Sequence, residues 1–198
     1  MDHGARSAGL TPESPAPRLY DDLAAWWPLL SPPTEYVDEA ADLLPRLGIA
    51  AGSGSATLLE LGAGGGSLAF HLKRHFRLTL TDRAPAMLAV SRELNPECEH
   101  LVGDIRSLRL GREFDVILIH DAIMYATDQA ALRATLRTAA IHCRPGGTVA
   151  ICWTTFGRRS LRRPITADTT PATGPSRWST GCLHRHPKRQ RVADGVSW

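Results

Sequence analysis

Cysteine is scarce in this sequence, and its spacing excludes the sites that cysteine usually builds. Among 198 residues there are four cysteines, and no two of them form a C-x-x-C pair. We therefore expect neither a disulfide framework nor a zinc site, and isolated reduced thiols are typical of a cytoplasmic protein. His184 and His186 lie close together but have no partner ligands nearby in the sequence, so no metal is predicted.

Long hydrophobic runs are also missing. The apolar stretches have the length of strands, which is too short for a membrane span. The first 17 residues are polar and rich in Pro, Ser and Gly, without the apolar segment of a secretory signal. We interpret residues 1–18 as a flexible leader and predict a cytoplasmic protein without a membrane partner.

Excess positive charge is confined to the end of the chain. Residues 153–198 contain nine Lys and Arg against two Asp, whereas residues 1–152 contain 14 basic and 18 acidic residues. An acidic body argues against nucleic acid as a partner. The hydrophobic content of 43% is enough for a core, and the length suits one domain, here residues 19–152. The sequence does not indicate an oligomeric state.

Short apolar segments alternate with helical patterns through this domain. Such alternation predicts an α/β fold with a doubly wound, Rossmann-like parallel sheet and helices on both faces. The amphipathic segment 34–47 and a short segment ending at Pro28 are predicted as further helices, and Arg144–Gly147 as a turn. Strands are expected at 57–61, 77–82, 100–102, 114–119 and 148–152, with helices at about 67–75, 85–94 and 127–141.

A glycine-rich turn follows the first predicted strand. Gly62, Gly64 and Gly66 stand directly before a helix-like segment. Glycine permits positive φ and close approach of a ligand, and a helix start offers unpaired N–H groups. We interpret the turn as a nucleotide-type cofactor site, although a plain tight turn has the same pattern. Glu60 precedes it, where a buried carboxylate costs free energy unless a partner satisfies it.

Acidic residues follow the next two strands. Asp82 ends the second strand about 20 residues beyond the glycine turn, a spacing typical of a carboxylate that binds ribose hydroxyls. Capping of the helix that starts at Pro85, by Asp82 or Arg83, is the alternative. Asp104 follows the third strand and could accept an adenine amino group, with Ile105 packed on the ring, but a surface turn has the same pattern.

Aromatic residues make up only 6% of the chain, yet three of them gather near the N-terminus. Tyr20, Trp26 and Trp27 could form a lid over a ligand or simply pack onto the core, and the sequence leaves both open.

With these motifs in order, the chain resembles the class I S-adenosylmethionine-dependent methyltransferases of the bacterial small-molecule type over residues 19–152. The resemblance implies methyl transfer from S-adenosylmethionine to an O, N or C nucleophile of a small-molecule substrate. Holding the nucleophile in line with the methyl group is then expected to provide much of the catalysis. The motifs that carry the resemblance are Glu60–Gly66, Asp82, Gly103–Ile105, Phe114–His120 and Arg144–Gly147.

The resemblance also implies site residues. His120 is the candidate catalytic base, needed only where the nucleophile must lose a proton, with Asp121 and Tyr125 behind it. The alternative is that His120 only lines the pocket. The cofactor is expected at Tyr20, Glu60, Gly62, Ala63, Gly64, Gly66, Asp82, Arg83, Met87, Asp104, Ile105 and His120.

After the fifth strand the chain departs from the family pattern. The family continues with a helix and two further strands, whereas residues 153–198 are rich in Arg, Thr, Pro and Ser and lack apolar periodicity. We expect this tail to be disordered, and the sheet to lack its last two strands and expose its edge. Our hypothesis is a truncated or out-of-frame C-terminus, and a natural basic tail for an acidic partner is the alternative.

Two other functions fit part of the pattern. An inactive, truncated methyltransferase-like or cofactor-binding domain would explain the unusual tail. An NAD-dependent oxidoreductase would also use a glycine turn and an acid such as Asp82, but Glu60 before the turn, and Ser67 in place of the third glycine, argue against it.

Overall fold

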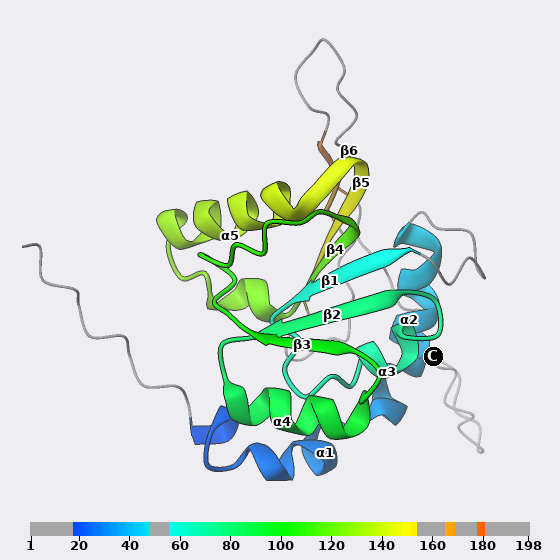
Figure 1. Ribbon diagram of the computed structural model, residues 1–198, viewed down its shortest axis with the longest axis vertical. Coiled ribbons are helices and arrows are strands. Elements are labelled where there is room, and N and C mark those ends of the chain that lie inside the picture. The colour runs from blue at the N-terminus through cyan, green and yellow to red at the C-terminus, as the bar shows by residue number, and fades with distance from the viewer. Residues whose placement is uncertain (1–17, 48–55, 154–164, 169–177, 181–198) are drawn as a thin grey trace, which may run out of the picture.

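A twisted sheet forms the centre of the molecule (Figure 1). The computed structural model describes residues 18–47, 56–153, 165–168 and 178–180. Within these residues the strand order is β3-β2-β1-β4-β5-β6-β7, and the first five strands are parallel. Their bounds are β1 (Thr57–Leu61), β2 (Arg77–Asp82), β3 (Glu99–Val102), β4 (Phe114–His120) and β5 (Cys143–Cys152).

Helices cover both faces of this sheet, as predicted. One core cluster packs α2, α3 and η4 on one face, and a second packs α5 and the 105–110 segment on the other, so that α2 and α5 lie on opposite sides (Figure 1). The α-helices are α1 (Trp27–Leu30), α2 (Val37–Leu43), α3 (Ala69–Leu72), α4 (Pro85–Leu94) and α5 (Gln129–His142). The 3₁₀ helices are η1 (Arg18–Tyr20), η2 (Ala24–Trp26), η3 (Pro33–Tyr36), η4 (Leu44–Leu47) and η5 (Ala122–Tyr125).

The central strands form where the sequence is continuously apolar. Val116–Ile119 of β4 and Leu58–Leu59 of β1 are fully buried, because helices cover both faces of a parallel sheet. The sequence also marks the start of α5. The Asp128 side chain accepts a hydrogen bond from Ala131 N at 2.7 Å and so caps the first turn. The predicted doubly wound, Rossmann-like architecture is confirmed.

Three local predictions were wrong. The helix near Pro28 does not end there, because α1 runs from Trp27 to Leu30 with the proline in its first turn, where no N–H is needed. Residues Arg144–Gly147 belong to β5, whose pairing with β4 shifts register between Phe114 and Val116, so an irregular strand replaces the turn. The helix after the glycine turn is also shorter than predicted.

The sheet does not end at β5, which corrects the prediction that its last two strands are missing. β6 (Ile165–Asp168) pairs antiparallel with β5, and β7 (Trp178–Thr180) pairs antiparallel with β6. The prediction rested on the missing apolar periodicity after residue 152. Hydrogen bonds between strands join backbone groups, however, so short edge strands can form without such a pattern. The leader, the His184–His186 pair and the rest of the predicted disordered tail lie outside the described residues.

Three further features concern the described ranges alone. None of the helices there is both long and apolar enough to cross a membrane. No disulfide joins Cys98, Cys143 and Cys152 to one another. No cluster of three or more potential metal ligands occurs in this part of the chain.

His142 is a fully buried polar link between α5 and the segment before β4. Its Nδ1 donates to Thr138 O at 2.8 Å, and its Nε2 accepts from Leu110 N at 2.9 Å. We expect His142→Leu to destabilise the fold by about 2 kcal/mol, because the Leu110 N–H loses its acceptor inside the protein. Urea unfolding measures this, with Arg137→Leu on the exposed side of α5 as control, and equal midpoints for the two variants would contradict it.

Candidate functional site

The glycine loop between β1 and α3 has the positive φ values that its glycines permit. Gly64 and Gly66 have φ values of 55° and 76°, in the left-handed region that side chains other than glycine rarely adopt. Gly64 N donates to Asp82 Oδ2 at 2.9 Å, which joins the loop to the carboxyl end of β2. A Cβ on Gly64 would have only the Met87 Cε near it, at 3.6 Å. The loop is therefore bare backbone at this point.

The far end of the loop is held by α4. Asn95 Nδ2 donates to Gly66 O at 3.0 Å, and a Cβ on Gly66 would lie 2.3 Å from Ser91 Oγ and 2.5 Å from Asn95 Nδ2. Gly66 is thus required by packing as well as by its φ value.

The two glycines predict different outcomes on substitution. We expect Gly64→Ala to cost about 1–2 kcal/mol, the penalty for a left-handed residue, and Gly66→Ala to cost clearly more because its Cβ also collides with α4. Urea unfolding of both variants tests this, and each serves as the other's control. Equal losses would show that the α4 contact is not tight.

Asp82 connects the loop to the start of α4. Its Oδ2 accepts from Gly64 N and its Oδ1 accepts from Ala84 N, both at 2.9 Å. Burial raises its pKa, although the hydrogen bonds from Ala84 and Gly64 oppose this rise. Asp82 therefore supports the helix start, the predicted alternative, and also stands at the carboxyl end of the sheet where ribose was predicted.

Glu60 is the least satisfied charged group in the described part of the chain. It is 2% exposed, and its Oε2 has no hydrogen-bond partner among the described residues. Burial raises its pKa to about 7, with His120 opposing the rise and Asp82 and Glu39 adding to it. Burying a carboxyl oxygen without a hydrogen-bond donor costs free energy, so a donor group brought to Oε2 would lower that cost.

His120 ends β4 beside Glu60 and is held from α2. Its Nε2 donates to Glu39 Oε1 at 2.7 Å, and the two side chains are 9% and 11% exposed. Burial alone would lower its pKa, but the Glu39 hydrogen bond and the charges of Glu39, Asp121 and Glu60 raise it to about 9. The candidate base is therefore mainly an imidazolium at neutral pH in the absence of ligands.

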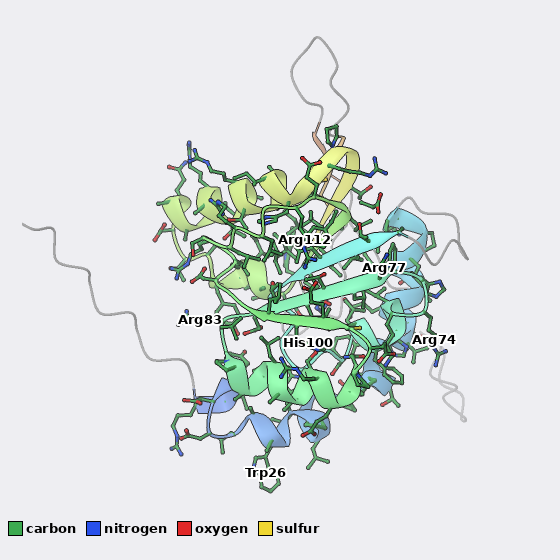
Figure 2. The ribbon with its side chains drawn as sticks, in the orientation of Figure 1. Trp26, Arg74, Arg77, Arg83, His100 and Arg112 are labelled. Atoms are coloured by element: carbon green, nitrogen blue, oxygen red, sulfur yellow. The ribbon has the colours of Figure 1, made fainter. Side chains whose placement is uncertain are left out.

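The predicted adenine-side residues separate into two roles. Ile105 lies against Gly62, where a Cβ on the glycine would be 3.8 Å from its Cγ2. The Arg106 guanidinium binds the Asp104 carboxylate and lowers the pKa of that carboxyl. Arg83 is exposed at the carboxyl ends of the strands (Figure 2), and its charge acts on Asp82 and Asp104.

Aromatic residues from the N-terminal segment and from η5 lie close together, and one of them packs on the loop. The Tyr20 hydroxyl hydrogen-bonds the Tyr125 hydroxyl, and the Tyr20 ring lies 5.7 Å from the Trp27 ring. A Cβ on Gly65 would be 2.1 Å from Trp27 Cδ1, so this tryptophan packs directly on the loop. Trp26 is 61% exposed and projects away from the body (Figure 2). Tyr20 and Trp27 thus lie together, an arrangement that fits both a lid and packing onto the core, whereas Trp26 lies apart from them.

Glu39 is the site residue that sequence reasoning missed. It lies one turn before the buried Leu43 on α2, so an acid shares the helix face that the apolar pattern assigns to the core. That single acid was the only available signal, and nothing local linked it to His120.

The comparisons with known proteins agree with this geometry. Residues 58–147 match a family of methyltransferase domains. This stretch of the chain is therefore similar to a methyltransferase domain. It is similar to nodulation protein S of Sinorhizobium fredii, with 28% identity over 149 residues that cover 73% of this chain and 68% of that protein. It is 33% identical over 119 residues to a dTDP-3-amino-3,6-dideoxy-alpha-D-glucopyranose N,N-dimethyltransferase of Streptomyces fradiae, covering 59% of this chain but 46% of that one.

Solved methyltransferases share the fold of this domain. CalS10, an amino pentose methyltransferase from Micromonospora echinaspora bound to S-adenosylmethionine, superposes with a TM-score of 0.55 at 24% identity, covering 76% of this chain and 77% of its own. The glycopeptide N-methyltransferase MtfA in complex with S-adenosylmethionine gives 0.52 at 21%, covering 74% and 75%. The predicted resemblance to S-adenosylmethionine-dependent small-molecule methyltransferases is confirmed.

Proposed function

We propose that this protein transfers a methyl group from S-adenosylmethionine to a small molecule, with an amine nitrogen as the first acceptor to test. The observation that carries the proposal is the buried Glu60 carboxyl, whose Oε2 has no hydrogen-bond partner among the described residues, beside a glycine loop of bare backbone near the carboxyl end of β1. This is the edge of an open α/β sheet where ligands bind.

The residues present fit S-adenosylmethionine. Glu60 supplies an acceptor for the amino group of its methionine part, and Asp82 supplies carboxylate oxygens with lone pairs beyond their two backbone hydrogen bonds for the ribose hydroxyls. Ile105 beside Gly62 offers an apolar surface for adenine. When bound, the cofactor supplies an electrophilic methyl group on a positively charged sulfur.

The chain's own residues then bind, orient and exclude water. Trp27 packs on the glycine loop, and Tyr20 joins it to Tyr125, so these three rings would serve as an aromatic cover. Placement of the acceptor atom in line with the methyl group supplies most of the rate, and His120 is the side chain able to take up a proton there.

Two observations support an amine as the acceptor. The Streptomyces fradiae relative is named as an N,N-dimethyltransferase, and the solved MtfA is titled as a glycopeptide N-methyltransferase. The carboxylates of Glu39 and Asp121 near His120 also favour a cationic ammonium group over an anionic acceptor. A trans-aconitate 2-methyltransferase of Azoarcus sp., 31% identical over 115 residues, makes a carboxylic acid the second class to test.

Calorimetric titration and a methyl-transfer assay test the proposal. We expect S-adenosylmethionine and S-adenosylhomocysteine to bind and NAD not to bind. Transfer of isotope-labelled methyl should then occur to nucleotide-linked amino sugars in preference to tricarboxylic acids. The surface variant Arg137→Leu is the control for folding. A well-folded protein that gives no heat with millimolar S-adenosylmethionine would overturn the cofactor assignment.

A further inference from the structure

The Glu39–His120 pair reaches across two parts of the chain that are 81 residues apart. Glu39 belongs to α2 of the N-terminal segment, whereas His120 ends the central strand β4. Both side chains are almost entirely buried. A buried charged pair of this kind does not add much stability over apolar packing, so its position at the site calls for another explanation.

The geometry leaves one ring nitrogen available. Glu39 occupies Nε2, and among the described residues Nδ1 makes no hydrogen bond. The Tyr36 ring packs edge-on against the imidazole, with centroids 6.0 Å apart at 72°, and so fixes the plane of the ring. An imidazole held by a carboxylate at one nitrogen and open at the other is the arrangement of an oriented general base.

We propose that Glu39 is a positioning residue that orients His120 so that Nδ1 takes the proton released by the methyl acceptor. The inference rests on the proposed function. In the active form Nε2–H donates to Glu39 and Nδ1 carries the lone pair. An ammonium acceptor passes one proton to Nδ1. With the cofactor bound, the freed nitrogen lone pair would form the new C–N bond to the methyl carbon, and the electron pair of the breaking C–S bond would go to sulfur.

The charges around the imidazole set the pH at which this happens. Glu39 and Tyr36 face it from the N-terminal segment, Glu60 from β1, Asp121 from the end of its own strand and Cys152 from the paired position on β5. Because these groups favour the imidazolium, the base form grows as pH rises toward about 9. We therefore expect kcat/KM for an amine to increase with pH up to about this value.

Glu39→Gln tests the role of the carboxylate while keeping the side-chain shape. We expect the break in the kcat/KM profile to fall by about one pH unit or more, because the largest charge that stabilises the imidazolium is removed. Glu39→Asp should restore part of the shift. Asp42→Asn, one turn further along the same helix, removes a charge without touching His120 and should leave the profile unchanged. In a His120→Gln background, Glu39→Gln should no longer move the break.

Nuclear magnetic resonance gives a reading that needs no turnover. The His120 ring signals, assigned by their loss in His120→Gln, should titrate at lower pH in Glu39→Gln than in the parent protein. An unchanged titration and an unchanged kinetic break in a variant that still binds S-adenosylmethionine would overturn the inference. Failure of the proposed function is distinct, because it appears as absent cofactor heat in the parent protein.

Discussion

Glu60→Gln is expected to make the protein more stable and a weaker cofactor binder at the same time. The pKa of the buried Glu60 is raised from 4.5 to about 7, so folding favours the protonated carboxyl. Its contribution to stability is fully present below about pH 4.5 and is lost as pH rises through about 7. The difference between the two pKa values corresponds to about 3 kcal/mol of stability that is lost at pH 8. Glutamine carries no charge and avoids this loss.

Urea unfolding at several pH values between 5 and 8 measures the effect. We expect the parent protein to lose stability across this range and Glu60→Gln to lose about 2 kcal/mol less. Affinity for S-adenosylmethionine, measured by calorimetry at pH 8, should fall about 10–100-fold, because a hydrogen bond to a charged acceptor is removed. The exposed Glu93→Gln on α4 is the control. A variant with the same pH slope as the parent would show that Glu60 is not the group that titrates.

Asp82→Asn is expected to have the larger effect on binding. Both carboxylate oxygens accept backbone N–H groups, from Gly64 and Ala84, so the amide nitrogen of asparagine must face one donor with another. This costs about 1–3 kcal/mol of stability and displaces the glycine loop. Losing the ribose acceptor and the loop geometry together should weaken S-adenosylmethionine binding at least about 100-fold.

Asp104→Asn is the matched control for that experiment. Asp104 also follows a strand at this edge, but its carboxylate is already bound by Arg106. We expect less than about a fivefold change in affinity for this variant, measured by the same titration. Equal losses of affinity in the two variants would show that the Asp104 carboxylate serves the ligand as much as Asp82 does, despite its pairing with Arg106. Asp82 would then have no distinct role.

The central parallel strands were predicted from the sequence more fully than the short helix at Pro28 and the edge strands. Buried parallel strands such as β4 are continuously apolar, and the glycine turn and Asp82 mark strand ends by chemistry that does not depend on distant residues. The helix at Pro28 and the edge strands β6 and β7 were misjudged, because both depend on backbone contacts that tertiary packing selects.

The site divides in the same way. The sequence by itself determined the α/β architecture, the glycine loop and the acids near the ends of β1 and β2. Each of these depends on a few consecutive residues, whose types set the backbone conformation and the burial of a strand. Only the tertiary structure decided that Glu39 holds His120 and that Arg106 takes the Asp104 carboxylate. Those pairings depend on which side chains the fold buries together, because a buried charge costs free energy unless it is paired.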